Sequence, residues 1–148
     1  MMTAVGVPMI WMGEEFGEHV PMSEQSNKID WTLLENDANK DLREYYRTLI
    51  RFRTSNPACR SNNVDFFHED PDAGVLCFQR FDDEGSVIVV ALNLSDDTLE
   101  DYTVTNFPLD GPCREITNDS ALVASESAVT LDLPRRAGFL FTKGEADG

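Results

Sequence analysis

Two adjacent carboxylates near the N-terminus, Glu14 and Glu15, are the first residues of this sequence whose type could support acid–base chemistry. A catalytic carboxylate pair faces its substrate from two sides, with the two groups about 5 Å apart when one of them acts as a nucleophile. Neighbouring residues at the end of a strand point in opposite directions, so at most one of these carboxylates can face a given site. We therefore do not predict that Glu14 and Glu15 form a catalytic pair.

The histidines and cysteines show no spacing typical of catalysis or of metal binding. Neither His19 nor His68 has a serine, a cysteine or a metal-ligand motif at a sequence spacing typical of a catalytic or metal site. The acidic residues around His68 lack the EF-hand spacing with its glutamate at position twelve, which favours a turn between two strands. The three cysteines, Cys59, Cys77 and Cys113, lie far apart, and we expect them to be reduced core residues. The sequence thus predicts no metal site and no cofactor.

Composition places the chain among soluble globular proteins. It has 148 residues, of which 41% are hydrophobic and 26% charged, enough for one ordinary domain. The net charge of −15 argues against nucleic acid as a partner, because phosphate binding depends on clustered lysine and arginine. No apolar stretch is long enough for a membrane-spanning helix, and the N-terminus does not resemble a secretory signal. The cytoplasm is the expected location.

A continuous apolar run over Val7–Met12 is followed by a glycine and two carboxylates. An apolar run without polar alternation is typical of a strand that is buried on both faces, as in a parallel sheet or a barrel. Parallel strands are joined by connections of a dozen or more residues, whereas six residues precede this run. We therefore expect the strand to lack parallel neighbours within this chain, and its uncovered edges and apolar face to favour self-association.

One long helix is predicted between Asn36 and Asn56. Asn36 and the residues that follow it can cap the start of a helix. Within residues 42–53, apolar side chains recur at intervals of three and four, as on one face of a helix. Asn56 precedes Pro57 and ends the helix, because the residue before a proline avoids helical geometry. Residues 17–27, between the apolar run and this helix, are predicted to form a polar loop.

From Arg60 onward the hydrophobic period changes to two, which predicts an antiparallel β domain with a boundary near Arg60. The solidly apolar run Val87–Leu92 should be a central strand. We expect residues 1–59 and 60–143 to form two units, and residues 144–148 to be a flexible tail. The predicted strands are Val64–Phe67, Val75–Phe81, Ser86–Leu92, Tyr102–Phe107, Arg114–Thr117, Leu122–Val123, Ala128–Leu133 and Gly138–Thr142.

The segment Pro8–Gly17, which reads PMIWMGEEFG, resembles the region around the eighth barrel strand of the α-amylase superfamily, glycoside hydrolase family thirteen. The version in this chain is most similar to those of glycogen branching enzymes and cyanobacterial-type α-amylases. The resemblance spans nearly the whole chain, because four later segments are similar, in the same order, to the sequence that follows this strand in those enzymes. These segments are Lys28–Leu34, Asn56–Ala58, Phe66–Asp72 and Val75–Arg80.

The resemblance implies a mainly β fold, in which an antiparallel β-sandwich of the α-amylase C-terminal all-β type follows the last strand and helix of a (β/α)8 barrel. The three catalytic carboxylates of these enzymes lie on earlier strands, so this chain is expected to contain no catalytic residue and to be inactive alone. Gly13 and Glu15 match the Gly-x-Glu motif, whose carboxylate supports the barrel top in the family. His19 lies in a loop that borders the substrate groove there. The implied substrate of the parent enzyme is an α-1,4-glucan such as glycogen, which is cleaved and then hydrolysed or transferred.

Aromatic side chains are the groups on which sugar rings stack. Most aromatic residues of this chain fall in the predicted strands or on the helix stripe, where a core role explains them. Trp31 and Tyr102 are not explained in this way, and they are the candidates for sugar stacking. There is no tandem of tryptophans of the kind expected in a dedicated starch-binding module.

Two other interpretations remain open at the level of sequence. One is a stand-alone β-sandwich that binds glucan or a protein partner, with the N-terminal strand and helix folded over it. The other is an all-β domain without a ligand, which accounts for residues 60–142 but not for the motif over residues 6–17. How the Val7–Met12 strand is covered distinguishes a stand-alone sandwich from the C-terminal part of a larger enzyme, since a stand-alone protein must bury that strand.

Overall fold

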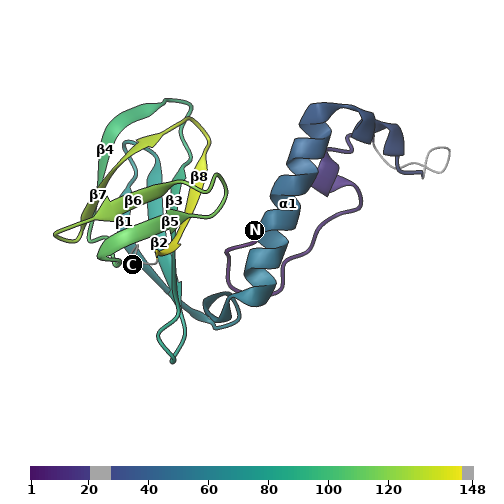
Figure 1. The fold of residues 1–148 in the computed structure, drawn as a ribbon. Helices are drawn as coiled ribbons and strands as arrows, with labels where there is room; N and C mark the ends of the chain where they lie inside the picture. The colour runs from purple at the N-terminus through teal and green to yellow at the C-terminus, as the bar shows by residue number, and fades with distance from the viewer. Residues whose placement is uncertain (21–27, 145–148) are drawn as a thin grey trace.

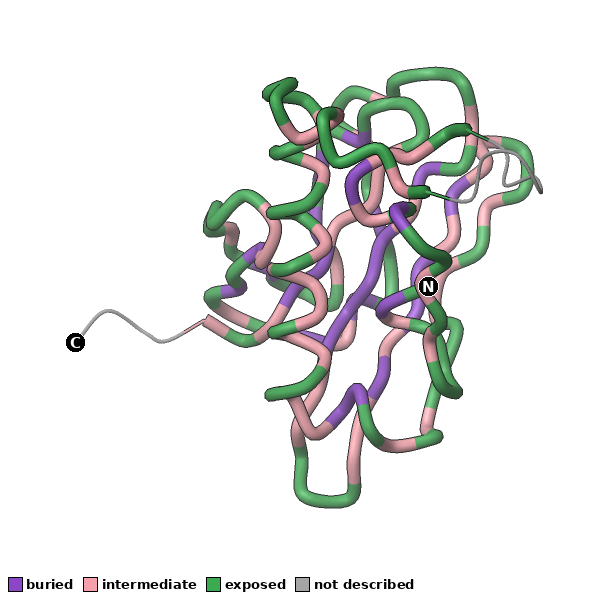
Figure 2. Tube along the Cα trace, turned by 90° about the vertical axis from the view of Figure 1, so that its right-hand side faces the viewer, coloured by how far each residue is buried: buried purple, intermediate pink, exposed green. Residues whose placement is uncertain are grey.

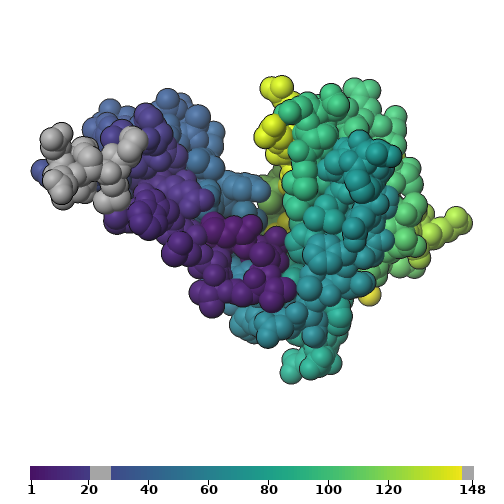
Figure 3. All heavy atoms as spheres, turned by 180° about the vertical axis from the view of Figure 1, so that it is seen from behind, coloured from purple at the N-terminus to yellow at the C-terminus, as the bar shows by residue number. Residues whose placement is uncertain are grey.

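The computed structural model describes residues 1–20 and 28–144 of the 148-residue chain. Figure 1 shows a helical part that contains the N-terminus and a β part that contains the remaining chain. Most of the predicted polar loop over residues 17–27, and residues 145–148 of the predicted tail, lie outside the described residues. In Figure 3 the first residues of the chain lie at the junction between the helical and β parts.

The predicted strand over Val7–Met12 has no strand partner among the described residues, whose first strand is β1, Asn63–Asp70. The segment is extended chain, and Val7 and Met9 are 97% and 71% exposed. The segment ends at a short 3-10 turn, η1 (Glu14–Phe16), and a second such turn, η2 (Trp31–Glu35), precedes the helix. Because a strand forms only when its backbone pairs with a neighbouring strand, an apolar sequence alone does not make a strand here.

Helix α1, Asp37–Ser55, confirms the predicted helix and its limits. The Asn36 side chain accepts a hydrogen bond from the backbone N–H of Ala38 over 2.9 Å, which caps the start of the helix. At the other end, the Asn56 side chain accepts from the N–H of Ala58 over 3.0 Å and begins η3, Pro57–Cys59. No residue of α1 is fully buried. Among the described residues, no helix is long and apolar enough to cross a membrane.

The β part consists of two antiparallel sheets, which confirms the predicted sandwich. The larger sheet has six strands in the order β1-β2-β3-β8-β5-β6, and the smaller one pairs β4 with β7. Strand β3 is central, as its apolar sequence predicts. The remaining strands are β2 (Val75–Phe81), β3 (Val87–Asn93), β4 (Leu99–Thr105), β5 (Gly111–Glu115), β6 (Ala121–Ala124), β7 (Ala128–Leu133) and β8 (Gly138–Lys143).

Both faces of the six-stranded sheet carry an apolar core, which explains why β3 is apolar without alternation. Alternate residues of a strand point to opposite faces. Val89 and Ala91 belong to the core between the two sheets, whereas Ile88 and Val90 belong to a second core on the outer face. Leu49 and Phe52 of α1 pack against that second core, as does η3. In Figure 2 most buried positions accordingly lie along the strands, and most exposed ones lie outside them.

Candidate functional site

The turn that follows the exposed segment is held in place by Gly13. This residue is buried and has a φ of 82°, a conformation that side chains with a Cβ rarely adopt. A Cβ at this position would lie 2.5 Å from Cβ of Glu18. Gly13 precedes η1, and the Asn39 side chain of α1 donates to the carbonyl of Phe16 over 2.7 Å. The turn therefore requires glycine and is tied to the helix.

Glu14, rather than Glu15, has the defined hydrogen bonds in this turn. Oε2 of Glu14 accepts from the N–H of Trp11 over 3.1 Å, and Oε1 accepts from the hydroxyl of Tyr46 on α1 over 3.1 Å. Burial, together with the bond to Glu14, raises the pKa of Tyr46. Glu15 is partly buried beside these groups. Sequence reasoning did not identify the Glu14–Tyr46 contact, because Tyr46 fits the apolar stripe of the helix.

His19 and Trp31 lie near this turn. His19 is exposed, and its neighbour Glu18 accepts from the N–H groups of Val20 and Asp30 over 2.9 and 2.7 Å, which lowers the pKa of Glu18. Asp30 caps η2. Trp31 packs on buried Phe16, with ring centroids 5.3 Å apart, yet 60% of Trp31 is exposed. The structure thus brings four of the candidates, Gly13, Glu15, His19 and Trp31, to one end of α1.

Tyr102 lies away from these residues, on β4 of the small sheet, and its hydroxyl takes part in hydrogen bonds. The hydroxyl donates to Oδ2 of Asp70 over 2.9 Å and lies 2.8 Å from Nε2 of His68. The rings of His68 and Tyr102 meet edge to face, with centroids 5.7 Å apart. Burial, together with the hydrogen bond to Asp70, raises the pKa of Tyr102 to about 12. Tyr102 is therefore partly buried in a contact between the sheets and is not grouped with Trp31.

Two arginines that sequence reasoning did not single out as functional hold the start of the chain. Arg53 of α1 donates to the carbonyls of Met2, Ala4 and Gly6. Arg80 of β2 is fully buried and donates to the carbonyls of Thr3 and Ala4. Buried cations have no local sequence pattern, so only the fold reveals these contacts.

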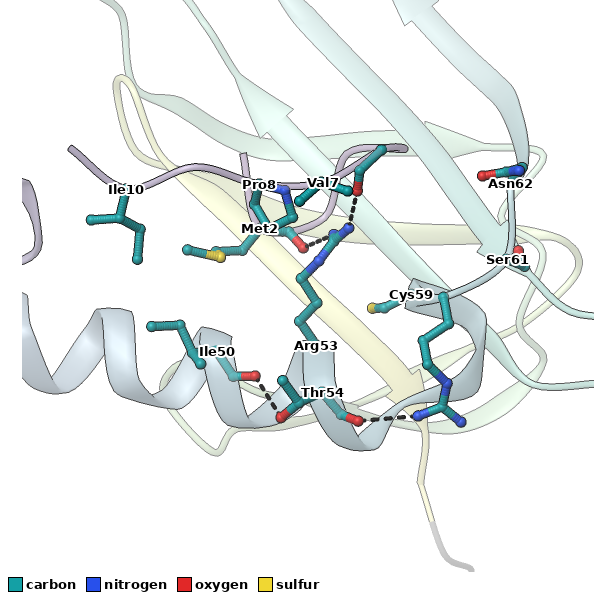
Figure 4. Close-up of a pocket in the computed structure, with 12 residues that line it drawn as sticks. Met2, Val7, Pro8, Ile10, Ile50, Arg53, Thr54, Cys59, Ser61 and Asn62 are labelled. Atoms are coloured by element: carbon teal, nitrogen blue, oxygen red, sulfur yellow. Dashed lines mark hydrogen bonds between the residues drawn. The ribbon is translucent and has the colours of Figure 1, made fainter.

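A pocket of about 770 Å³ opens between the N-terminal segment, α1 and η3 (Figure 4). Its walls are mostly apolar, and Arg53 and Cys59 also line it. Burial raises the pKa of the Cys59 thiol, which keeps the sulfur neutral and unreactive. The apolar wall residues include Val7, Pro8, Ile10 and Ile50.

The residues of the turn, the apolar segment and the pocket can bind another surface and support the fold. The residues of the chain that the structure describes contain no group of three or more histidine, cysteine, aspartate or glutamate side chains able to hold a metal ion. Glu14 accepts from the Trp11 N–H and the Tyr46 hydroxyl, and these bonds join the turn to α1. The apolar segment and pocket instead offer a surface for another apolar surface.

Comparison with known proteins identifies the β part. The family model of the α-amylase C-terminal all-β domain matches residues 67–143, which is more than half of the chain. This match covers the sandwich from the end of β1 to the end of β8.

Two curated relatives carry the name 1,4-alpha-glucan branching enzyme GlgB. The relative from Novosphingobium aromaticivorans is 27% identical over 122 residues, and that from Burkholderia vietnamiensis is 30% identical over 124 residues. The matches cover 78% and 80% of this chain but only 17% of each relative. The chain therefore spans about a sixth of the length of these relatives.

Solved structures share the fold beyond the sandwich. The α-amylase from Geobacillus thermoleovorans, solved with acarbose, has a TM-score of 0.72 at 20% identity and covers 97% of this chain and 31% of its own. The pullulanase from Anoxybacillus sp. LM18-11 has a TM-score of 0.68 at 14% identity and covers 97% of this chain and 22% of its own. These matches show a shared fold, and because the family model spans more than half of the chain, the chain belongs to the family of α-amylase C-terminal all-β domains.

Proposed function

We propose that this chain is the non-catalytic C-terminal portion of an α-glucan-active enzyme, either a 1,4-α-glucan branching enzyme or an α-amylase. Residues 1–59 would form the end of a (β/α)8 barrel, and residues 60–143 the sandwich that stabilises it. The names of the curated relatives favour the branching enzyme. The proposed setting is carbohydrate metabolism, in line with the names of these relatives, in the cytoplasm.

The observation that carries this proposal is the uncovered apolar surface of the N-terminal part. Val7, Met9 and Trp11 are 97%, 71% and 62% exposed, and no residue of the adjacent helix is fully buried. Large contiguous apolar surfaces of soluble proteins mark places where another surface packs. In the proposed parent enzyme, the preceding strands and helices of the barrel would cover this surface and fill the pocket beside it.

The turn at Gly13, which packs near the start of α1, would then border the substrate groove. Gly13 holds the turn, Glu15 would support the barrel top, and His19 would face the groove from the following loop. Trp31 is the better placed of the two proposed stacking residues, since Phe16 supports its ring and most of its surface is open. Tyr102 remains a second candidate on the sandwich, and a glucan there would meet the edge of a ring that already contacts His68.

The first test is an iodine-stain assay for cleavage or branching of amylose by the purified chain, run beside calorimetric titration with maltoheptaose and glycogen. We expect no turnover, because nucleophile and general acid are both missing. Turnover would show that the chain contains its own catalytic residues and would refute the proposal.

A chimera tests the structural role directly. In the N. aromaticivorans relative, the region that matches this chain is replaced by residues 1–144, and the chimera is compared with the same relative truncated before that region. We expect the chimera to be soluble and to branch amylose, and the truncated form to do neither. The matched control is the chimera with Val7→Asp and Met9→Asp, which places charges on the surface that the barrel should cover. Equal activity of the control and the parent chimera would contradict the proposed packing.

The second candidate function is a stand-alone module that binds glucan or a protein partner, and the exposure of Trp31 favours the glucan. In that case the titration would give binding without turnover, and Trp31→Ala would remove it while Trp11→Ala would not. The uncovered segment over residues 7–12 would then also favour self-association, which sedimentation velocity detects as a concentration-dependent species.

A further inference from the structure

The first residues of the chain are held by cations from two parts of the fold. Residues 2–6 have no strand partner among the described residues, yet every carbonyl from Met2 to Ala4, and that of Gly6, accepts a hydrogen bond from an arginine. One arginine belongs to α1 and the other to β2. The junction in Figure 3, where the N-terminal residues lie between helix and sandwich, is therefore built by arginine side chains.

Arg80 approaches this segment from the sandwich. Its Nη1 donates to the carbonyls of Thr3 and Ala4, both over 2.9 Å, and its Nη2 donates to the carbonyls of Cys59 and Ser61. The side chain is fully buried, and burial lowers its pKa. None of the ion pairs among the described residues involves it. An apolar side chain would fill a buried position at a smaller desolvation cost, so the carbonyl groups explain why a cation lies there.

Arg53 approaches the same segment from the helix, as Figure 4 shows. Its Nη1 donates to the carbonyl of Met2 over 2.5 Å and to that of Ala4 over 3.0 Å, and its Nη2 donates to the carbonyl of Gly6 over 2.6 Å. The carbonyl of Ala4 thus accepts from both arginines. A planar guanidinium suits this task, because it presents several N–H donors in a fixed fork that an ammonium group lacks.

The segment changes direction where the arginine contacts end. Gly6 has a φ of 98°, in the left-handed region that glycine adopts readily, and the apolar run over residues 7–12 begins directly after it. The position and direction of residues 7–12 therefore depend on how residues 2–6 are fixed. Residues 7–12 in turn lead into the Gly13 turn at the other end of α1.

We propose that Arg53 and Arg80 form a carbonyl clamp through which the sandwich and α1 together position the segment 7–12 and the turn at Gly13. The part of this inference that concerns an enzyme rests on the proposed function, since there the segment would be the last barrel strand. In that setting both arginines are positioning residues: they touch no substrate and act through the backbone that they hold.

The clamp is tested on the chain itself by nuclear magnetic resonance. The methyl signal of Met2, a buried residue, reports whether the segment is docked, and the ¹H–¹⁵N heteronuclear NOE of residues 3–7 reports its motion on the picosecond-to-nanosecond timescale. In Arg53→Met we expect the Met2 methyl signal to move to its random-coil position and the NOE of residues 3–7 to fall to that of a free chain end. Arg80→Lys should have the same effect, because lysine keeps the charge but loses the fork.

Two matched variants separate the clamp from general stability. Arg51→Met removes an exposed arginine from the same helix and should leave both signals unchanged. Leu133→Ala opens the core between the sheets and should lower the urea midpoint while the Met2 signal and the NOE stay as in the parent. If Arg80→Lys does not fold, Arg53→Met alone decides, since Arg53 is only partly buried.

A docked Met2 and an unchanged NOE in folded Arg53→Met would overturn the clamp. This outcome is independent of the chimera, whose activity tests the barrel and not the arginines. A working clamp with an inactive chimera would refute the proposed function alone, whereas an active chimera together with a docked Met2 and an unchanged NOE in Arg53→Met would refute the clamp alone.

Discussion

The hydroxyl of Tyr102 donates to Asp70 over 2.9 Å while its oxygen lies 2.8 Å from Nε2 of His68. Nδ1 of His68 accepts from the N–H of Thr105 over 3.2 Å, so the ring proton of the neutral imidazole lies on Nε2 and points at the Tyr102 oxygen. These contacts join β4 of the small sheet to β1 at the edge of the large sheet. The two sheets are thus connected by these polar contacts as well as by the apolar core between them.

Removal of the Tyr102 hydroxyl should therefore loosen the two sheets. We expect Tyr102→Phe to lower the free energy of unfolding by about 1–2 kcal/mol, because Asp70 loses a donor and His68 loses an acceptor. The measurement is urea denaturation followed by circular dichroism. Thr103→Val, an exposed change on the same strand, should stay within about 0.5 kcal/mol of the parent. An equal effect of both variants would show that the hydroxyl contributes nothing specific.

Acid should weaken the protein through Asp70 and similar carboxylates. The N–H of Ala73, and then the Tyr102 hydroxyl, lower the pKa of Asp70 below its usual value. A folded pKa below the unfolded one gives stability that is present above the unfolded pKa and is lost as the pH falls through the folded pKa. The urea midpoint should thus decline below about pH 4. Asp70→Asn should reduce this decline, whereas Asp110→Asn, at an exposed position, should not.

Gly13 should be much less tolerant of alanine than Gly85. Both have positive φ values, 82° and 91°, so both substitutions carry backbone strain of about 1–2 kcal/mol. Only at Gly13 does the new Cβ collide with a neighbour, 2.5 Å from Cβ of Glu18, whereas nothing lies within 4 Å at Gly85. We expect Gly13→Ala to lose in addition the Tyr46–Glu14 contact, which nuclear magnetic resonance detects as a shift of the Tyr46 ring signals. Unchanged Tyr46 signals in Gly13→Ala would contradict this account of the turn.

The three cysteines should resist alkylation until the protein unfolds. Burial raises the pKa of Cys77 to about 12, and it also raises the pKa of Cys59 and Cys113. At pH 8 the thiolate population of Cys77 is then lower by about a thousandfold than that of a free cysteine. Mass spectrometry after iodoacetamide treatment should show no label in buffer and three labels in urea. One rapidly labelled site in buffer would identify a cysteine that is less buried than this structure has it.

Local signals in the sequence predicted most of the secondary structure. Asn36 and Asn56 delimit α1 through capping bonds that their own side chains make, and the period of two located the strands of the sandwich to within a few residues. Strand β4 begins at Leu99, before the predicted Tyr102, because an irregularity in its pairing with β7 separates the two residues. Such irregularities depend on the partner strand and leave no pattern in one sequence.

The candidate site was predictable only where a motif exists. Gly13 was identified through its motif, and its positive φ now gives the physical reason for glycine. Arg80 was not identified, because a buried cation bound by backbone carbonyls has no characteristic spacing; two of its acceptors, Thr3 and Ala4, are 77 and 76 residues away in the chain. The Tyr102 hydroxyl likewise depends on Asp70, 32 residues away, which no local pattern indicates.

The second apolar core bears on where this protein can be divided. Residues of the six-stranded sheet such as Ile88, Val90 and Leu140 are covered on the outer face by Leu49 and Phe52 of the helix. A truncated protein that begins at Arg60 would keep every strand and still expose this outer core to water. A fragment for recombinant expression, or for grafting onto another enzyme, should therefore begin before α1. The helix and the sandwich should be kept together as one unit.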